Sequence, residues 1–246
     1  MTYLSRIWLN PLRTRTHSFL RNRQSLHAAI LGGLSRQPVT ERVLWRLETA
    51  DRHRLSLLVL TTSRPSWEHL IEQAGWPGSD DPQAIVKAYQ PLLDQVTLGR
   101  QFAFRLHANT VGSTKKPEKP SPAQQNRLAA AGKEDKKPRG LRMPHRTAGH
   151  QLTWLHDRLE RWGFRPLTTD HGPTAYLVAR QRLSFDKRDD EHTRRVTLET
   201  GTFEGLIEII DPQTARRSLL DGVGPAKAYG LGLITLAPPH PTPDGA

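Results

Sequence analysis

We predict an α+β protein made of two ferredoxin-like domains, because strand and helix patterns follow a characteristic order along the chain. In the first half the order is strand, helix, strand, strand, helix, strand, which is that of a ferredoxin-like unit. After a stretch rich in Lys and Pro that has no periodicity, the second half shows a similar order. The chain has 246 residues, enough for two compact domains with a core each.

The first predicted domain, residues 1–108, contains a complete set of these elements. They are a strand at Tyr3–Leu9, a helix carrying Leu26, Ile30 and Leu34, a hairpin of Val43–Glu48 and Leu55–Thr61, a helical region from Trp67 to about Val96, and a closing strand at Gln101–His107. Alternating side chains mark the outer strands, and aliphatic residues at every fourth position mark one face of the first helix. Asn22 is placed to cap that helix.

A basic connector, residues 109–146, separates this domain from a second one, residues 147–246. The connector is rich in Lys, Pro, Gly and Arg, a composition typical of flexible linkers. The second domain is predicted to contain an amphipathic helix with Leu152, Leu155, Leu159 and Trp162, strands near Ala175–Phe185, Arg194–Thr200 and Thr202–Ile210, a helix opened by Asp211 and Pro212, a Gly-rich loop at 222–232 and a final strand at Leu231–Leu236. The two halves share element order but no sequence repeat.

The charge of the chain indicates a polyanionic partner. Its 36 Lys and Arg outnumber 24 Asp and Glu, giving a formal net charge of +12. Such a chain attracts nucleic acid at ordinary salt concentrations, although anionic lipid or simple solubility explains the same charge. Nucleic acid therefore leads the predicted partners.

Cysteine is absent, which excludes disulfides, zinc–thiolate sites and cysteine nucleophiles. The N-terminus has no secretory signal pattern, and no segment approaches the roughly twenty apolar residues that span a bilayer. We therefore predict a soluble, cytoplasmic protein with no membrane partner.

Several common catalytic and cofactor motifs are missing. Gly222 and Gly224 begin a GxG, but Lys227 occupies the place of the third glycine of a dinucleotide-binding loop. Neither a GK[ST] phosphate-binding motif nor a GxSxG nucleophile motif is present. Residues 189–192 offer carboxylates and an imidazole without a familiar metal-ligand spacing. We expect neither a cofactor nor a metal.

Specific segments then match a known family. They are the opening strand, Leu26-His27 on its helix, the turn Arg64–Trp67, the strand region Gly99–Thr110, the segment Phe203–Pro212 and the Gly-rich loop Gly222–Gly232. In sequence and order they resemble the CRISPR-repeat-cleaving endoribonucleases of the type I-E CasE family, from Leu4 to about Leu236.

The resemblance implies an activity and partners. It implies tandem ferredoxin-like domains and metal-independent cleavage of precursor crRNA at the 3′ base of the repeat hairpin, by attack of a 2′-hydroxyl that leaves a 2′,3′-cyclic phosphate or 3′-phosphate. It also implies retention of the crRNA 3′ handle within the Cascade complex, beside the backbone subunit nearest that end.

His27 is the candidate catalytic residue, because its position resembles that of the helix histidine in CasE enzymes. Imidazole titrates near neutrality, so it can act as base or acid in such a cleavage, and we favour the base. Family members place a tyrosine where this chain has Gln24, and some place a lysine where it has Gly32. These departures keep open a non-catalytic or very slow RNA-binding subunit of the same fold.

Two kinds of segment are candidate RNA contacts. The small residues of the Gly-rich loop allow backbone N–H groups to approach phosphates and Lys227 adds charge, although a packing turn between domains is equally consistent with the pattern. By resemblance, basic residues of the connector and of a predicted hairpin contact the RNA duplex, against the alternative of a solvated linker. The candidate RNA-binding residues are Lys115, Lys116, Arg139, Arg142, Arg146, Arg182, Gly222, Gly224, Lys227 and Gly230. A basic scaffold of a ribosome- or DNA-associated complex is the remaining alternative.

Overall fold

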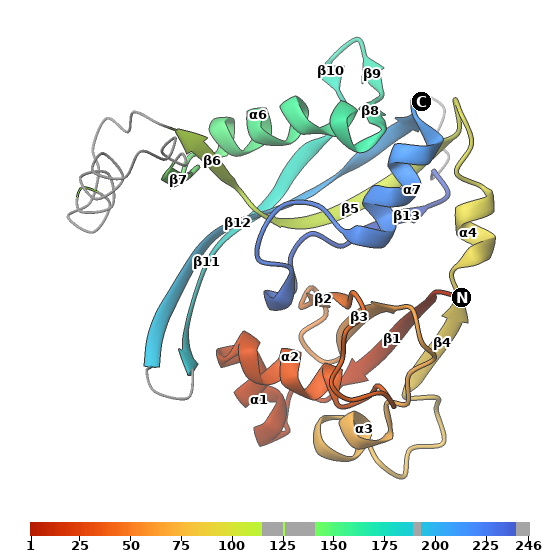
Figure 1. The fold of residues 1–246 in the computed structure, drawn as a ribbon, viewed down its shortest axis with the longest axis vertical. Helices are drawn as coiled ribbons and strands as arrows, with labels where there is room; N and C mark the ends of the chain where they lie inside the picture. The colour runs from red at the N-terminus through yellow and green to blue at the C-terminus, as the bar shows by residue number, and fades with distance from the viewer. Residues whose placement is uncertain (115–124, 126–140, 189–192, 240–246) are drawn as a thin grey trace.

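The computed structural model consists of two ferredoxin-like units whose sheets face each other, with the helices of each unit on the outside (Figure 1). It describes residues 1–114, 125, 141–188 and 193–239. The predicted fold class is therefore confirmed. Among the described residues, no helix combines the length and the apolar character needed to cross a bilayer.

The first unit is a four-stranded antiparallel sheet in the order β2-β3-β1-β4, which is the ferredoxin-like arrangement. Its elements are β1 (Tyr3–Leu9), α1 (Thr14–Arg21), α2 (Arg23–Leu31), β2 (Leu44–Glu48), β3 (Leu55–Thr61), α3 (Glu68–Ala74) and β4 (Ala84–Ala88). Ile7, Leu26, Trp45 and Leu70 belong to the fully buried core between the sheet and its helices. Because one face of α2 packs in this core, the opposite face of the helix is turned outward.

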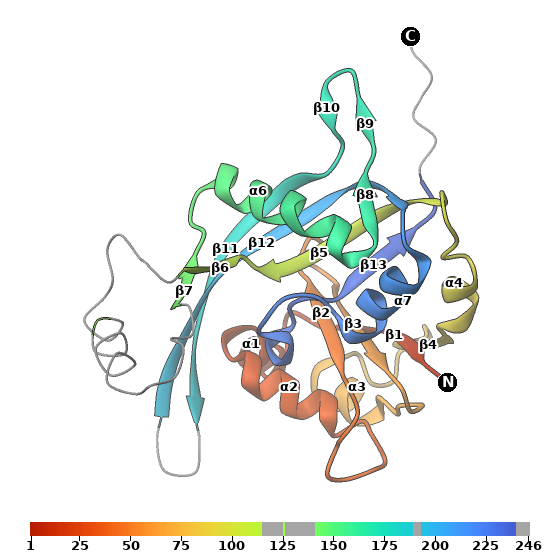
Figure 2. The ribbon, with the colours of Figure 1, turned by 45° about the horizontal axis from the view of Figure 1, so that its top comes forward.

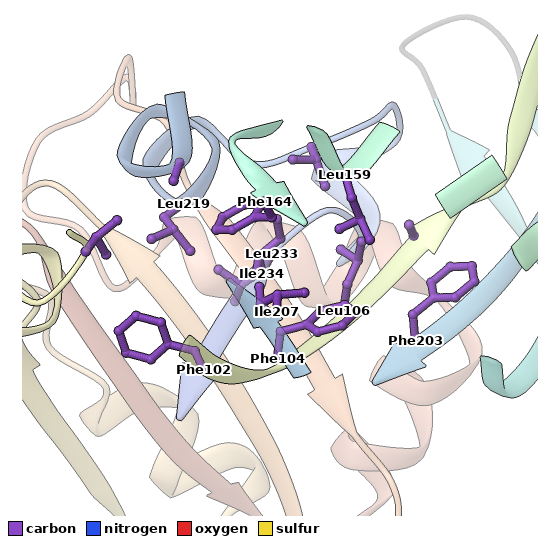
Figure 3. Close-up of a cluster of buried hydrophobic side chains, with 14 of the residues drawn as sticks. Phe102, Phe104, Leu106, Leu159, Phe164, Phe203, Ile207, Leu219, Leu233 and Ile234 are labelled. Atoms are coloured by element: carbon purple, nitrogen blue, oxygen red, sulfur yellow. The ribbon is translucent and has the colours of Figure 1, made fainter. Parts of the chain in front are cut away.

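The second unit has the same topology, with strands in the order β11-β12-β5-β13. After α4 (Gln90–Asp94) come β5 (Gln101–Asn109), β6 (Val111–Thr114), β7 (Leu141–Pro144), α6 (Ala148–Leu159), η1 (Glu160–Trp162), β8 (Phe164–Pro166), β9 (Thr168–Thr169), β10 (Gly172–Pro173), β11 (Tyr176–Arg188), β12 (Thr193–Ile209), α7 (Pro212–Asp221), η2 (Lys227–Tyr229) and β13 (Ile234–Ala237). Its core includes Phe102, Phe104, Leu106 and Phe203 (Figure 3). The same buried cluster also includes Leu44, Leu58 and Leu60 of β2 and β3, so it joins the two units.

One strand belongs to a different unit from the one expected. Gln101–His107, predicted to close the first sheet, lies in the second sheet between β12 and β13, so this prediction was wrong. The closing strand of the first sheet is instead β4, which pairs with β1 at one edge of the sheet. It interrupts the helical region predicted at 67–96. Alternation identifies a strand but not its partner; here Phe102 and Phe104 pack in the core of the second unit.

Other predicted boundaries also change. The runs predicted at Arg194–Thr200 and Thr202–Ile210 form one continuous strand, β12, and the final strand begins at Ile234 rather than Leu231. Helix α1 was not predicted in the basic stretch after Pro11. The ends of the predicted connector pair as β6 and β7. The two caps are confirmed, since the side chains of Asn22 and Asp211 accept hydrogen bonds from the first turns of α2 and α7.

The hairpin of β11 and β12 extends beyond the second unit alongside α1 and α2 (Figure 2). Asn22 Nδ2 donates to the carbonyl of Asp186 at 3.3 Å, and the rings of Phe185 and Tyr229 meet edge to face with centroids 4.8 Å apart. The hairpin, the start of α2 and the Gly-rich loop therefore converge.

Candidate active site

His27 lies half-buried on α2, at the edge of the helix face that Leu26 and Ile30 bury in the core. The indole Nε1–H of the buried Trp45, on β2, donates a hydrogen bond to His27 Nδ1 at 3.3 Å. The two rings are nearly parallel, 18° apart. A core residue of the sheet thus holds the imidazole ring.

This hydrogen bond defines the proton position on the neutral imidazole. An indole nitrogen only donates, so Nδ1 of His27 must carry the lone pair and Nε2 the hydrogen. Burial lowers the pKa of His27 from its ordinary value, because a partly desolvated ring disfavours the charged form. At neutral pH His27 therefore presents an N–H donor at Nε2.

His27 lines a cavity of about 470 Å³ together with Lys227 and Arg42. The cavity lies between α2, the loop before β2, and η2 with the end of α7. Partial burial and the Arg42 guanidinium lower the pKa of Lys227, while the nearby Asp221 carboxylate opposes that change. Two cations and an imidazole thus share a polar hollow, an arrangement suited to a phosphate group.

Carboxylates also line this cavity. Glu41 accepts hydrogen bonds from the backbone N–H and the hydroxyl of Ser63, both at 2.9 Å, so its charge is held by the turn after β3. Asp221 is exposed at the end of α7. The cavity therefore has mixed charge, with Lys227 and Arg42 as its cations.

The Gly-rich loop delivers Lys227 by packing on β2. Gly230 has φ +80°, and a Cβ built on it would lie 2.5 Å from the Trp45 ring. A Cβ on Gly222 would similarly lie 2.7 Å from Leu44 Cδ2. The packing interpretation therefore holds for Gly222 and Gly230, while Gly224 is exposed. The same contact that joins the two units brings Lys227 beside His27.

The two departures from the family pattern lie on the same helix. Gln24 is half-buried in the first turn of α2, and Gly32 ends the helix with an exposed backbone. Neither lines the cavity that His27 shares with Lys227. The cations near His27 therefore come from other segments of the chain.

The other predicted RNA-binding residues lie on separate surfaces. Arg182 is exposed on β11 and pairs with Glu199 of β12 at 3.0 Å. Arg142 lies in β7, and Arg146 is exposed just after it, its carbonyl accepting from Arg180 at 3.1 Å. Among the described residues of this set, only Lys227 lines a cavity with His27. Lys115, Lys116, Arg139 and the carboxylate-rich stretch 189–192 lie outside the described residues.

Sequence reasoning missed two residues of this site, Trp45 and Arg42. Trp45 lies within the strand predicted at Val43–Glu48, and its buried ring fits that pattern, which carries no signal for the role of its N–H. Arg42 lies exposed in the loop before β2, and among 36 Lys and Arg its type carries no signal. Only the fold shows that this loop faces the end of α2.

Comparisons with known proteins find relatives that match most of the chain. A family model described as "CRISPR associated protein" matches residues 2–238. The CRISPR-associated endoribonuclease Cse3 of Thermus thermophilus is 32% identical over 241 residues, covering 96% of this chain and 100% of that protein. The Cascade subunit CasE of Escherichia coli is 28% identical over 169 residues, covering 69% of this chain and 73% of that protein.

Solved structures show the same likeness. Thermus thermophilus Cse3 bound to an RNA representing a pre-cleavage complex has a TM-score of 0.72 at 31% identity, covering 96% of this chain and 99% of that one. Escherichia coli Cas6e has a TM-score of 0.54 at 19% identity, with 96% and 99% covered, and shares the fold.

Proposed function

The chain belongs to the CRISPR-associated protein family that includes Cse3 and CasE, and we propose that it is an endoribonuclease acting on the CRISPR repeat hairpin. It cleaves precursor crRNA at the 3′ base of the stem and stays bound to the crRNA 3′ handle as a subunit of Cascade. The observation that carries this proposal is the cavity where His27, Lys227 and Arg42 meet.

The cavity supplies groups that RNA cleavage requires. Attack by a 2′-hydroxyl on the adjacent phosphate builds negative charge on the phosphorane oxygens, and preorganised cations lower the energy of that charge. Lys227 and Arg42 would supply these cations in a chain that has Gln24 where family members have a tyrosine and Gly32 where some have a lysine. The cleavage needs no metal ion and leaves a 2′,3′-cyclic phosphate or 3′-phosphate.

The hydrogen bond from Trp45 argues against a base acting through Nε2 of His27. Such a base needs a lone pair on Nε2, whereas the indole donor places the neutral ring's hydrogen there. The role proposed for His27 is therefore an acid that gives its Nε2 proton to the 5′-oxygen leaving group, in place of the base expected from the sequence. This transfer starts from the charged ring and leaves the remaining hydrogen on Nδ1, so the contact with the indole N–H must open during the step.

Basic residues of several segments extend the RNA surface from this cavity. Lys227 lies in it, Arg182 lies on the long hairpin, and Arg142 and Arg146 lie at the end of the connector. Replacing any one of these phosphate-binding side chains with glutamine should reduce the slope of log affinity against log salt by about 1. Substitution of Arg64, exposed in the turn before α3, is the control of equal charge.

A non-catalytic RNA-binding subunit is the second candidate, favoured by Gln24 and Gly32. The test is to incubate the protein with repeat RNA from the same genome in EDTA and to analyse the RNA ends by mass spectrometry. Cleavage at the stem base with a cyclic phosphate or 3′-phosphate supports the endoribonuclease. Tight hairpin binding without cleavage supports the non-catalytic subunit, and equal affinity for unrelated duplexes supports a general basic scaffold. Co-purification with the backbone subunit nearest the crRNA 3′ end tests the Cascade contact.

A further inference from the structure

A second cavity, of about 350 Å³, lies between the two units and shares no lining residue with the His27 cavity. Its walls come from the start of α2, from β2 and β5, and from the base of the long hairpin. Three arginines line it, Arg23, Arg46 and Arg105, together with His107 and the carboxylate Glu48. The cavity is thus cationic and built from both units.

Arg46 and Arg105 are already neutralised. Arg46 bonds Glu48 at 2.6 Å and also donates to the carbonyls of Arg105 and Leu233. Arg105 pairs with Glu48 at 3.1 Å and with Glu204. The two carboxylates therefore balance the two arginines and leave no negative charge for a third.

Arg23 is that third arginine. It is only 7% exposed and has no ion pair with any residue in the described part of the chain, and its Nε lacks a hydrogen-bond partner there. Burial lowers its pKa to about 10, which leaves it charged at neutral pH. Its guanidinium lies 5.8 Å from the Trp45 ring centroid, a contact that offsets little of the cost of burying an unpaired charge.

His107 does not relieve this charge. Burial, followed by the charges of Arg23, Arg46 and Arg105, lowers the pKa of His107 to about 3, so its ring is neutral. Its Nε2 lies 2.9 Å from Thr200 Oγ1. The cavity thus combines the buried, unpaired cation of Arg23 with the Nε–H of Arg105, which also lacks a hydrogen-bond partner in the described part of the chain.

We propose that this cavity binds a phosphate group through Arg23, with Arg105 and His107 beside it. A guanidinium presents a planar fork of donors that fits two phosphate oxygens at once, and a buried, unpaired fork favours a multi-oxygen anion over chloride. The cavity admits a phosphate from either source, a phosphodiester of bound RNA or free phosphate. The proposal does not depend on the cleavage reaction.

The test measures the thermal stability of the RNA-free protein with inorganic phosphate, against chloride at the same ionic strength and pH. Wild type should gain about 2–4 °C in Tm at phosphate concentrations about ten times the Kd. Arg23→Gln should lose that gain, and Arg64→Gln, which removes an equal but exposed charge, should keep it. Equal stabilisation by chloride or acetate, or an undiminished gain in Arg23→Gln, would overturn the proposal.

A second measurement covers the case in which Arg23→Gln fails to fold. Wild-type crystals soaked in tungstate, a heavy tetrahedral analogue, should show an anomalous peak between Arg23 and His107, and a cavity without such a peak would contradict the proposal. Repeat-RNA affinity then separates the two sources. A loss of RNA affinity of about tenfold or more in Arg23→Gln, compared with Arg64→Gln, assigns the phosphate to RNA. Unchanged RNA affinity in Arg23→Gln, together with a phosphate stabilisation that wild type shows and Arg23→Gln lacks, assigns it to free phosphate.

Discussion

The indole N–H of Trp45 donates to Nδ1 of His27 at 3.3 Å. Trp45 is itself fixed by Gly230 of the Gly-rich loop, whose backbone packs against the indole ring. A contact between the two units therefore determines both the orientation of His27 and the position of its proton.

Trp45→Phe keeps an aromatic ring but removes the N–H donor. Because that donor stabilises only the neutral imidazole, its loss should raise the pKa of His27 and permit a proton on Nδ1. The fall in single-turnover cleavage with rising pH should then move to higher pH. The charges facing His27, Lys227, Arg42, Asp221 and Glu41, are unchanged in this variant. Nitrogen-15 NMR of the His27 ring reports the tautomer directly.

Trp154→Phe is the matched control for that experiment. Trp154 is also a buried tryptophan, and its indole N–H donates to the Val111 carbonyl at 2.9 Å, in the core of the second unit. Both variants should lose about 1–3 kcal/mol of unfolding free energy. A shift of the His27 pKa in Trp154→Phe, or its absence in Trp45→Phe, would show that the indole does not set the tautomer.

Gly230→Ala should disturb His27 through Trp45. Its φ of +80° strains any side chain, and its Cβ would clash with the indole ring. Gly99→Ala carries the same strain at φ +76° with no atom within 4 Å of its Cβ. In urea unfolding, backbone strain should cost each variant about 1–2 kcal/mol of unfolding free energy. The clash with the indole ring should make the total loss larger in Gly230→Ala, and only Gly230→Ala should slow cleavage. Equal losses in both variants would argue against the steric contact.

Lys227→Met and Arg42→Gln test the cations beside His27. If these residues stabilise the phosphorane, each substitution should lower the single-turnover rate by about 10²–10³ at saturating protein. Affinity for uncleaved repeat RNA should fall much less, since many other phosphate contacts remain. A fall in affinity for the RNA with an unchanged single-turnover rate at saturating protein would assign these residues to binding alone.

Stability should fall in mild acid because of His107. Its pKa of about 3 in the folded chain lies below the ordinary value of 6.5, so the unfolded chain binds more protons between these values. From pH 6.5 to 5 this should remove about 2 kcal/mol of unfolding free energy. In His107→Gln the unfolding free energy should no longer show this part of its dependence on pH. His53→Gln, which changes an exposed turn position, should keep it. Denaturant titrations at several pH values measure the difference.

The sequence predicts the element types well because alternation and capping are local. Tyr3–Leu9 and Asn22 illustrate this. Strand partners are not local, so Gln101–His107 was placed in the wrong sheet. The site shows the same limit: His27 was found through family resemblance, whereas Trp45 and Arg42 reach it only through packing.

The most direct test of the catalytic account compares wild type with His27→Ala on repeat RNA in EDTA under single-turnover conditions. We expect wild type to cleave at the stem base, and His27→Ala to bind the hairpin equally well but cleave about 10²–10⁴ times more slowly. His69→Ala, which removes another half-buried histidine, from α3, should cleave like wild type. Cleavage by His27→Ala at the wild-type rate would contradict the account.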